Sequence, residues 1–196
     1  MLVQTKRFTI AEYHRLDELG ILKQGDREAR TELIRGEIVY MVAKGIRHTF
    51  CCRNLLDELS TLIKGRARLQ CQDPIVLPTD SEPEPDFVIL RDRPDNYLTG
   101  HPTTNDILLV IEIADSSLNY DRDIKGALYA EAGIEYYWLF NLINNRLEAY
   151  SEPYRDAQRK GNYAQRKYVL SHQEIALPTF PDLKIELSKI LPNITE

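Results

Sequence analysis

The chain has 196 residues and a formal net charge of −5, with apolar and charged fractions of 43% and 28%. These values predict one globular domain, residues 1–196, and they exclude a disordered or strongly basic chain. The longest apolar runs are far shorter than the roughly 20 residues of a membrane span, and the first residues lack the pattern of a signal peptide. The three cysteines have the spacing of neither a zinc site nor a disulfide framework. We therefore expect a cytoplasmic protein without membrane contact.

The first elements in chain order are a helix and a hairpin. Thr9 and Glu12 have the spacing of a capping box, and Gly20 is a stop signal, so a helix is predicted between them. Two short apolar runs then flank Arg35 and Gly36 in "TELIRGEIVYM", a pattern that is typical of a β-hairpin.

The middle of the chain predicts a second helix and three strands. The helix lies in "RHTFCCRNLLDELSTLIKG" and ends at Gly65. "ARLQCQDPIVLP" and "PDFVIL" are predicted strands, and "NDILLVIEIA" has the apolar composition of a strand that is buried on both faces. The residues expected to face the core from the helix are Phe50 or Cys52, Leu55, Leu56, Leu59 and Ile63.

The last elements are a third helix and a strand pair. The helix follows "DSSLNYDR" and ends at Gly133, and "EYYWLFNL" and "RLEAYS" flank Asn144 and Asn145 as the strands of a turn would. This order of elements predicts an α/β (α+β) domain with a central mixed β-sheet.

Two acidic residues occupy positions where apolar side chains are expected. Asp86 begins the strand "PDFVIL", and Glu112 is the lone acid of "LLVIEIA". Burying an ionised carboxylate costs several kcal/mol unless a partner compensates it. If the two strands are neighbours, the carboxylates converge, and a divalent cation such as Mg²⁺ relieves their repulsion. Two simpler interpretations stay open: Asp86 caps a turn, or Glu112 pairs with an arginine.

Lys125 is a candidate cation for the same site. It lies near the start of the predicted third helix, on the side that Leu128 and Tyr129 turn toward the sheet. A lysine one turn into that helix can reach the strand end that carries Glu112. The alternative is an ordinary surface pair with Asp121, four residues earlier in the sequence.

These motifs carry a resemblance to a known family. "PEPDFVIL" followed by "LLVIEIA" resembles the PD-(D/E)XK signature of restriction-endonuclease-like nucleases. The chain also contains "TELIRGEIVYM" and His48 before "PEPDFVIL", and "VIEIADSS" and "YDRDIKGALYAEAGIEYYWLFN" after it. With these pieces in this order, the sequence resembles a bacterial family of putative restriction endonucleases. The resemblance covers roughly residues 8 to 150. It implies a restriction-endonuclease-like mixed sheet flanked by helices and a Mg²⁺-dependent phosphodiesterase site.

The resemblance also implies which residues form that site. Carried over position by position, Asp86 and Glu112 bind the metal, together with the backbone carbonyl of Ile113. Glu32 matches an acid that these nucleases supply from their N-terminal part, although Glu37 of the same hairpin is a competing position.

One position departs from the signature. Ala114 stands where the signature has lysine, and the resemblance implies that Lys125 supplies the charge instead. Whether this lysine positions or activates the attacking water stays open. The implied catalytic residues are Glu32, Asp86, Glu112 and Lys125, and the implied cofactor is Mg²⁺ or Mn²⁺.

Residues 155–167 form a basic segment with neighbouring and interleaved tyrosines, a combination that phosphate-binding surfaces use. A solvated hairpin tip has the same composition, so both interpretations stay open. His48 is expected either to begin the second helix or to contact substrate. The candidate nucleic-acid contacts are His48, Arg155, Arg159, Lys160, Arg166 and Lys167.

The residues and the resemblance together predict a Mg²⁺-dependent endonuclease that hydrolyses DNA phosphodiester bonds. Because restriction-type nucleases often cut as pairs, the resemblance implies a homodimer. One alternative is a catalytically inactive nuclease-fold module for DNA binding or protein interaction. Another is a structural dimer in which the inward acids form ion pairs with arginine.

Overall fold

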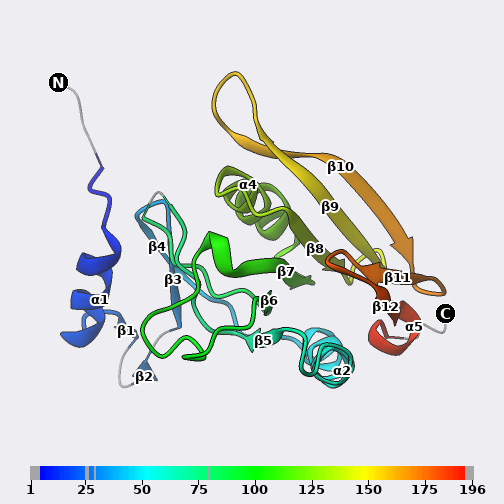
Figure 1. The fold of residues 1–196 in the computed structure, drawn as a ribbon. Coiled ribbons are helices and arrows are strands. Elements are labelled where there is room, and N and C mark those ends of the chain that lie inside the picture. Colours follow the sequence, from blue (N-terminus) through cyan, green and yellow to red (C-terminus); the bar gives the residue numbers. More distant parts are fainter. Residues whose placement is uncertain (1–4, 25–26, 29, 79, 193–196) are drawn as a thin grey trace.

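A mixed β-sheet forms the centre of the molecule. The computed structural model describes residues 5–24, 27–28, 30–78 and 80–192. The sheet has six strands in the order β10-β9-β8-β7-β6-β5 (Figure 1). The neighbours β7 and β8 are parallel, and the other neighbouring pairs are antiparallel, which confirms the predicted mixed sheet. Its strands are β5 (Arg68–Cys71), β6 (Phe87–Leu90), β7 (Ile107–Ala114), β8 (Tyr136–Asn141), β9 (Arg146–Arg155) and β10 (Gly161–Leu170).

Helices cover both faces of this sheet (Figure 1). On one face, α2 (Ile46–Leu62) contacts β5, β7 and α5 (Leu187–Ile190). On the other face, α4 (Gly126–Glu131) contacts β9 and β10. The connection from β7 to β8 runs through α3 (Leu118–Tyr120), one π-helical turn, η2 (Asp121–Lys125), and then α4. Parallel neighbours need such a crossover, and this one places helical residues over β7.

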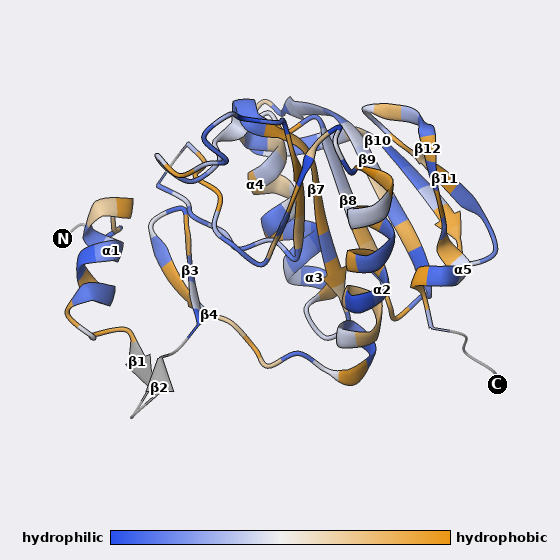
Figure 2. Cartoon of the chain, turned by 60° about the horizontal axis from the view of Figure 1, so that its bottom comes forward, coloured by the Kyte–Doolittle hydropathy of each residue, from blue (hydrophilic) through white to orange (hydrophobic). Residues whose placement is uncertain are grey.

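The alternation of side chains along β7 decides what Glu112 meets. Ile111 and Ile113 belong to the core beneath α2. Val110 and Ala114 belong to the core beneath α4. Because strand residues two apart share a face, Glu112 lies on the α4 side. Figure 2 shows β7 as a mostly hydrophobic strand inside the molecule and hydrophilic residues on the outer turns of α2.

Helix α2 is present as predicted, and Cys52, one of the two alternatives Phe50 and Cys52, packs against the core, whereas Leu56 lies outside it. Phe50 and Leu56 are 45% and 42% exposed. Residues four apart stay on one face of a helix, so the buried stripe that begins at Cys51 excludes both of them. That stripe consists of Cys51, Leu55 and Leu59, with Ile63 just after the helix and Cys52 packed at the edge.

The N-terminal elements carry the predicted cap and turn. Helix α1 (Ile10–Glu18) begins after Thr9, whose hydroxyl accepts from the Glu12 amide, while the Glu12 carboxylate accepts from the Thr9 amide. Strands β3 (Thr31–Ile34) and β4 (Glu37–Tyr40) pair around Arg35 and Gly36. These two residues have φ angles of 49° and 76°, the left-handed values of a tight hairpin turn.

The remaining elements lie outside the central sheet. No helix in the described part of the chain is both long enough and apolar enough to cross a membrane. The short elements are β1 (Lys23–Gln24), β2 (Arg27–Glu28), η1 (Thr104–Asp106), β11 (Glu174–Leu177) and β12 (Phe180–Glu186).

Candidate active site

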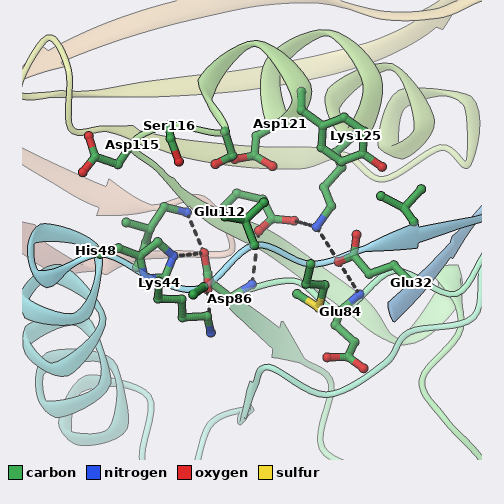
Figure 3. Close-up of a pocket in the computed structure, with 18 of the residues that line it drawn as sticks. Glu32, Lys44, His48, Glu84, Asp86, Glu112, Asp115, Ser116, Asp121 and Lys125 are labelled. Atoms are coloured by element: carbon green, nitrogen blue, oxygen red, sulfur yellow. Dashed lines mark hydrogen bonds and ion pairs between the residues drawn. The ribbon is translucent and has the colours of Figure 1, made fainter. Parts of the chain in front are cut away.

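Asp86 and Glu112 lie side by side where β6 meets β7 (Figure 3). The antiparallel register pairs Phe87 with Ile111, and one further step along both strands places the two acids opposite each other. The Asp86 amide nitrogen lies 3.3 Å from Oε2 of Glu112, and the Ile113 amide donates to Oδ2 of Asp86 at 2.9 Å. Asp86 and Glu112 are 7% and 3% exposed. The two strands are neighbours, and the two acids converge.

Lys125 reaches this pair from η2. Its ammonium donates to Oε1 of Glu112 at 3.0 Å and to Oε1 of Glu32 at 2.7 Å. The hydroxyl of Tyr129, one turn later, donates to the same Glu112 oxygen at 2.7 Å. Lys125 is buried, so it is not the surface partner of Asp121 that the spacing also allowed. The cation beside Glu112 is this lysine and not an arginine.

The burial of these groups shifts their pKa values. Burial raises the pKa of Glu112 to about 8, although Lys125 opposes this shift. Burial alone lowers the pKa of Lys125, but the carboxylates of Glu112, Glu32 and Asp121 outweigh it and hold the pKa well above its usual value. Lys125 therefore remains an ammonium cation at neutral pH.

Asp86 has its own set of partners. Nε2 of His48 lies 2.9 Å from Oδ2, Nζ of Lys44 lies 3.6 Å from Oδ1, and the Gln72 side-chain amide donates at 3.4 Å. Burial raises the pKa of Asp86. His48, the Ile113 amide and Lys44 together lower it by more than burial raises it, so the net shift is downward. Asp86 is therefore an ionised carboxylate at neutral pH. His48 lies in the first turn of α2, the helix start that the sequence suggested, and it also contacts the acid directly.

The hairpin supplies Glu32 and not Glu37 to the site. Glu32 is 2% exposed, and its Oε1 accepts from the Glu84 amide at 3.0 Å in addition to Lys125. Glu37 is exposed and lies 3.4 Å from Arg7. Of the two positions that the sequence left in competition, only Glu32 faces the acids of β6 and β7.

These residues line one cavity of about 380 Å³. The β3–β4 hairpin with the loop after it contributes to the lining, and so do residues 115–117, 120 and 121 after β7. Six acids and two lysines line the cavity, so its charge is strongly negative. The acids are Glu32, Glu84, Asp86, Glu112, Asp115 and Asp121, and the lysines are Lys44 and Lys125.

Several residues of this cavity escaped the sequence analysis. Lys44 and Tyr120 gave no signal, because each is an ordinary polar residue of a loop or helix that only the folded chain brings to the acids. Tyr129 was expected to face the sheet, but its hydrogen bond to Glu112 was not foreseen. Asp121 appeared as a surface acid, but it is buried, and burial raises its pKa to about 6. The π-helical turn was missed as well, although such turns are frequent at functional sites.

The basic segment of residues 155–167 lies at a distance from this cavity. Arg155, Arg159 and Lys160 lie at the end of the β9–β10 hairpin (Figure 1), whereas Arg166 and Lys167 lie further along β10, and none of the five lines the cavity. The Arg155 guanidinium donates to the Glu131 carbonyl at 2.6 Å. Arg166 lies over the Tyr168 ring, with 5.0 Å to the ring centre. The segment belongs to the β9–β10 hairpin, and its role in binding nucleic acid stays a prediction.

The donor set of the cavity suits a divalent cation. Among the described residues, no three His, Cys, Asp or Glu side chains form a ready-made metal cage. Mg²⁺, however, is commonly bound through one or two carboxylates and keeps its other positions for water and phosphate. Asp86 and Glu112 provide two adjacent carboxylates in a cavity with excess negative charge. These two residues fit Mg²⁺. The Glu32 carboxylate instead accepts hydrogen bonds from Lys125 and the Glu84 amide through its Oε1.

A mixed sheet between helices, with paired acids on neighbouring strands beside a buried lysine, defines a restriction-endonuclease-like protein. A family profile described as "Putative restriction endonuclease" (Uma2) matches residues 10–188, and the chain belongs to this family. The fold is similar to a crystal structure of a "putative nuclease belonging to DUF820" from Anabaena variabilis. That similarity has a TM-score of 0.68 at 15% sequence identity and covers 93% of this chain and 97% of the other. No curated protein matches the sequence.

Proposed function

We propose that this protein is a Mg²⁺-dependent endonuclease that hydrolyses phosphodiester bonds of DNA. The observation that carries the proposal is the convergence of Asp86 and Glu112 beside the buried ammonium of Lys125. Membership of a family described as "Putative restriction endonuclease" supports the same reaction class. When bound, Mg²⁺ supplies positive charge for the phosphate and lowers the pKa of a water molecule.

The protein's own residues have distinct roles in this proposal. Asp86 and Glu112 hold the cation, with the Ile113 carbonyl as a further oxygen ligand. Tyr129 and Lys125 fix the orientation of the Glu112 carboxylate through the hydrogen bonds to its Oε1.

Lys125 acts as a cation and not as a base, because its raised pKa keeps it protonated. Its charge stabilises the negative charge that develops on the phosphate in the transition state. Glu32 accepts a second hydrogen bond from this ammonium and so helps to hold it in place.

The proposal extends to the partners of the protein. DNA is the substrate, and the basic segment of the β9–β10 hairpin contacts its backbone through Arg155, Arg159, Lys160, Arg166 and Lys167. The protein acts as a homodimer, as the resemblance to restriction-type nucleases implied, and in the cytoplasm, as its cysteines and first residues suggested.

Cleavage of a supercoiled plasmid tests the proposal. The purified protein with Mg²⁺ or Mn²⁺ should nick or linearise the plasmid, and a chelator should stop the reaction. Asp86→Ala and Glu112→Ala should each abolish cleavage, whereas the exposed acid variant Glu135→Ala should not. If Asp86→Ala and Glu112→Ala are folded, as verified by circular dichroism, and both still cleave the plasmid, these residues are excluded from the mechanism.

One observation favours a second candidate function. Lys125 pairs with both Glu112 and Glu32, and His48 pairs with Asp86, so the acids already have partners within the protein. This network suits a catalytically inactive nuclease-fold module that binds DNA or another protein. That candidate predicts no cleavage and no effect of Mg²⁺ on the melting temperature.

A further inference from the structure

We infer that the acidic cavity accepts one nucleotide of a DNA strand that has left its duplex, so that the protein prefers single-stranded or frayed DNA to the interior of a duplex. This inference rests on the proposed nuclease function and names its substrate class. Four features of the cavity carry it: its depth, its buried donors without a hydrogen-bond partner, its apolar wall and its negative charge.

The depth of the acids limits what can reach them. Asp86, Glu112 and Lys125 are 7%, 3% and 4% exposed, at the base of a cavity of about 380 Å³. This volume is at the lower end of the range of sites that enclose one small molecule, about 300–1,000 Å³. A duplex presents its phosphates on a rod far wider than such a cavity. A single nucleotide with its flanking phosphate can enter, as it does in enzymes that take a nucleotide out of the base stack.

Three buried polar atoms of the cavity lining have no hydrogen-bond partner among the described residues: Nζ of Lys44, the hydroxyl of Tyr120 and Nδ1 of His48. The Lys44 ammonium and the Tyr120 hydroxyl are donors on two walls of the cavity. Lys44 belongs to the loop after β4, and its ammonium forms an ion pair with Asp86 at 3.6 Å. Tyr120 belongs to α3 in the other wall of the cavity. Buried donors normally have partners, and phosphate oxygens between the two walls would satisfy both.

The wall above these donors is apolar. Residues 39–43 line the cavity with side chains that carry no charge. Tyr40 is 49% exposed and Val42 is 81% exposed, so both are accessible to a ligand. Aromatic and apolar side chains next to a phosphate site provide a stacking surface for an unpaired base, whatever its identity. Bases that remain paired inside a duplex do not offer their faces to such a wall.

The charge of the cavity disfavours a second DNA strand. Glu84 and Asp115 belong to its lining in addition to the buried acids. Each is paired with an arginine, Arg30 and Arg47 respectively, yet the lining itself holds six acids against two lysines. A second strand held close to the cavity brings its phosphates toward these carboxylates, and this repulsion is absent when one strand enters alone.

The test compares DNA of one sequence in three forms of about 30 nucleotides: single strand, blunt duplex, and duplex with an unpaired end. Cleavage is followed with Mg²⁺, and binding is followed separately by fluorescence anisotropy with Ca²⁺. We expect the single strand and the unpaired end to be cut and bound at least about tenfold better than the duplex interior.

Matched variants separate the wall and the donors from general effects. Val42→Asp should remove most of the preference for single strands, whereas Leu98→Asp, at an equally exposed apolar residue outside the cavity, should keep it. Lys44→Ala should weaken binding of all three forms, unlike Lys64→Ala. Tyr120→Phe should also weaken binding of all three.

Each outcome decides the inference independently of the proposed function. Equal cleavage of single strand and duplex overturns the inference and leaves the nuclease function standing. If no DNA is cut, the nuclease function fails, and the anisotropy data still decide the substrate form. A single-strand preference that Val42→Asp removes supports the inference, and equal or absent binding of the two forms overturns it.

Discussion

The ammonium of Lys125 lies 3.0 Å from Oε1 of Glu112, although the two residues come from different elements, 13 positions apart. The strand position two residues after Glu112 is Ala114, which is fully buried under α4. The π-helical turn that contains Lys125 brings the ammonium back over the strand. A cation therefore lies beside Glu112, but the residue that carries it, Lys125, belongs to the crossover between β7 and β8 and not to β7 itself.

Removal of the Lys125 charge should harm both stability and catalysis. In Lys125→Met the buried carboxylates of Glu112 and Glu32 lose their shared cation, and breaking a buried pair in this way typically costs about 3–5 kcal/mol. Urea denaturation should show this loss, and plasmid cleavage should fall by at least about a hundredfold. Lys64→Met, at an exposed lysine, should change neither measurement. Unimpaired cleavage in Lys125→Met would contradict a catalytic role for the ammonium.

Tyr129 should tune the acid through one hydrogen bond. Tyr129→Phe removes the 2.7 Å donor to Oε1 of Glu112, and a carboxylate that loses a donor is protonated more easily, so its pKa rises. The pH midpoint of plasmid cleavage should therefore move upward, with a loss of about 1 kcal/mol in stability.

Tyr163→Phe is the matched control for Tyr129→Phe. Its buried hydroxyl donates to the Ile134 carbonyl at 2.9 Å, outside the acidic cavity. This variant should lose similar stability and keep the pH midpoint. A shift of equal size in both variants means that Tyr129 acts only through stability.

The raised pKa of Glu112 makes metal binding depend on pH. Its pKa of about 8 lies above the usual value of 4.5. Between these values the folded protein holds a proton that the unfolded chain releases, so the contribution of Glu112 to stability falls as pH rises. Mg²⁺ binds the carboxylate form and should raise the melting temperature more at about pH 8.5 than at about pH 6. Glu112→Gln should lose this difference and Glu135→Gln should keep it; an equal increase at both pH values argues against Mg²⁺ on this acid.

The sequence carried enough information for the local elements and for the two acids. The capping box of Thr9 and Glu12 and the hairpin at Arg35 depend on neighbouring residues, so they are visible in the sequence. Asp86 and Glu112 were visible because an acid in an apolar strand has a high free energy without a partner.

The features that tertiary packing decides were not visible. Whether Glu32 or Glu37 faces the site depends on how the hairpin docks against β6 and η2, which no local pattern shows. The burial of Cys51 in place of Phe50 depends on the rotation of α2 against the sheet. Lys44 joins the site only because its loop folds over the start of β6.

The two acids of the β3–β4 hairpin offer the most closely matched comparison. Glu32→Gln keeps the volume of the side chain but removes one of the charges that hold Lys125, whereas Glu37→Gln changes an exposed residue on the facing strand. Because Glu32 holds the ammonium, we expect Glu32→Gln to lower the rate of plasmid cleavage by about tenfold to a hundredfold.

Glu37→Gln should leave the cleavage rate unchanged within about twofold, since an exposed ion pair such as that with Arg7 contributes little. Single-turnover rates and Mg²⁺ titrations of both variants check this. The rate should fall in Glu32→Gln with little change in the Mg²⁺ midpoint, because Glu32 orients the lysine and does not bind the metal. A large shift of the Mg²⁺ midpoint in Glu32→Gln instead places Glu32 among the metal ligands. A loss of cleavage rate in Glu37→Gln contradicts the assignment of Glu32, and not Glu37, to the site.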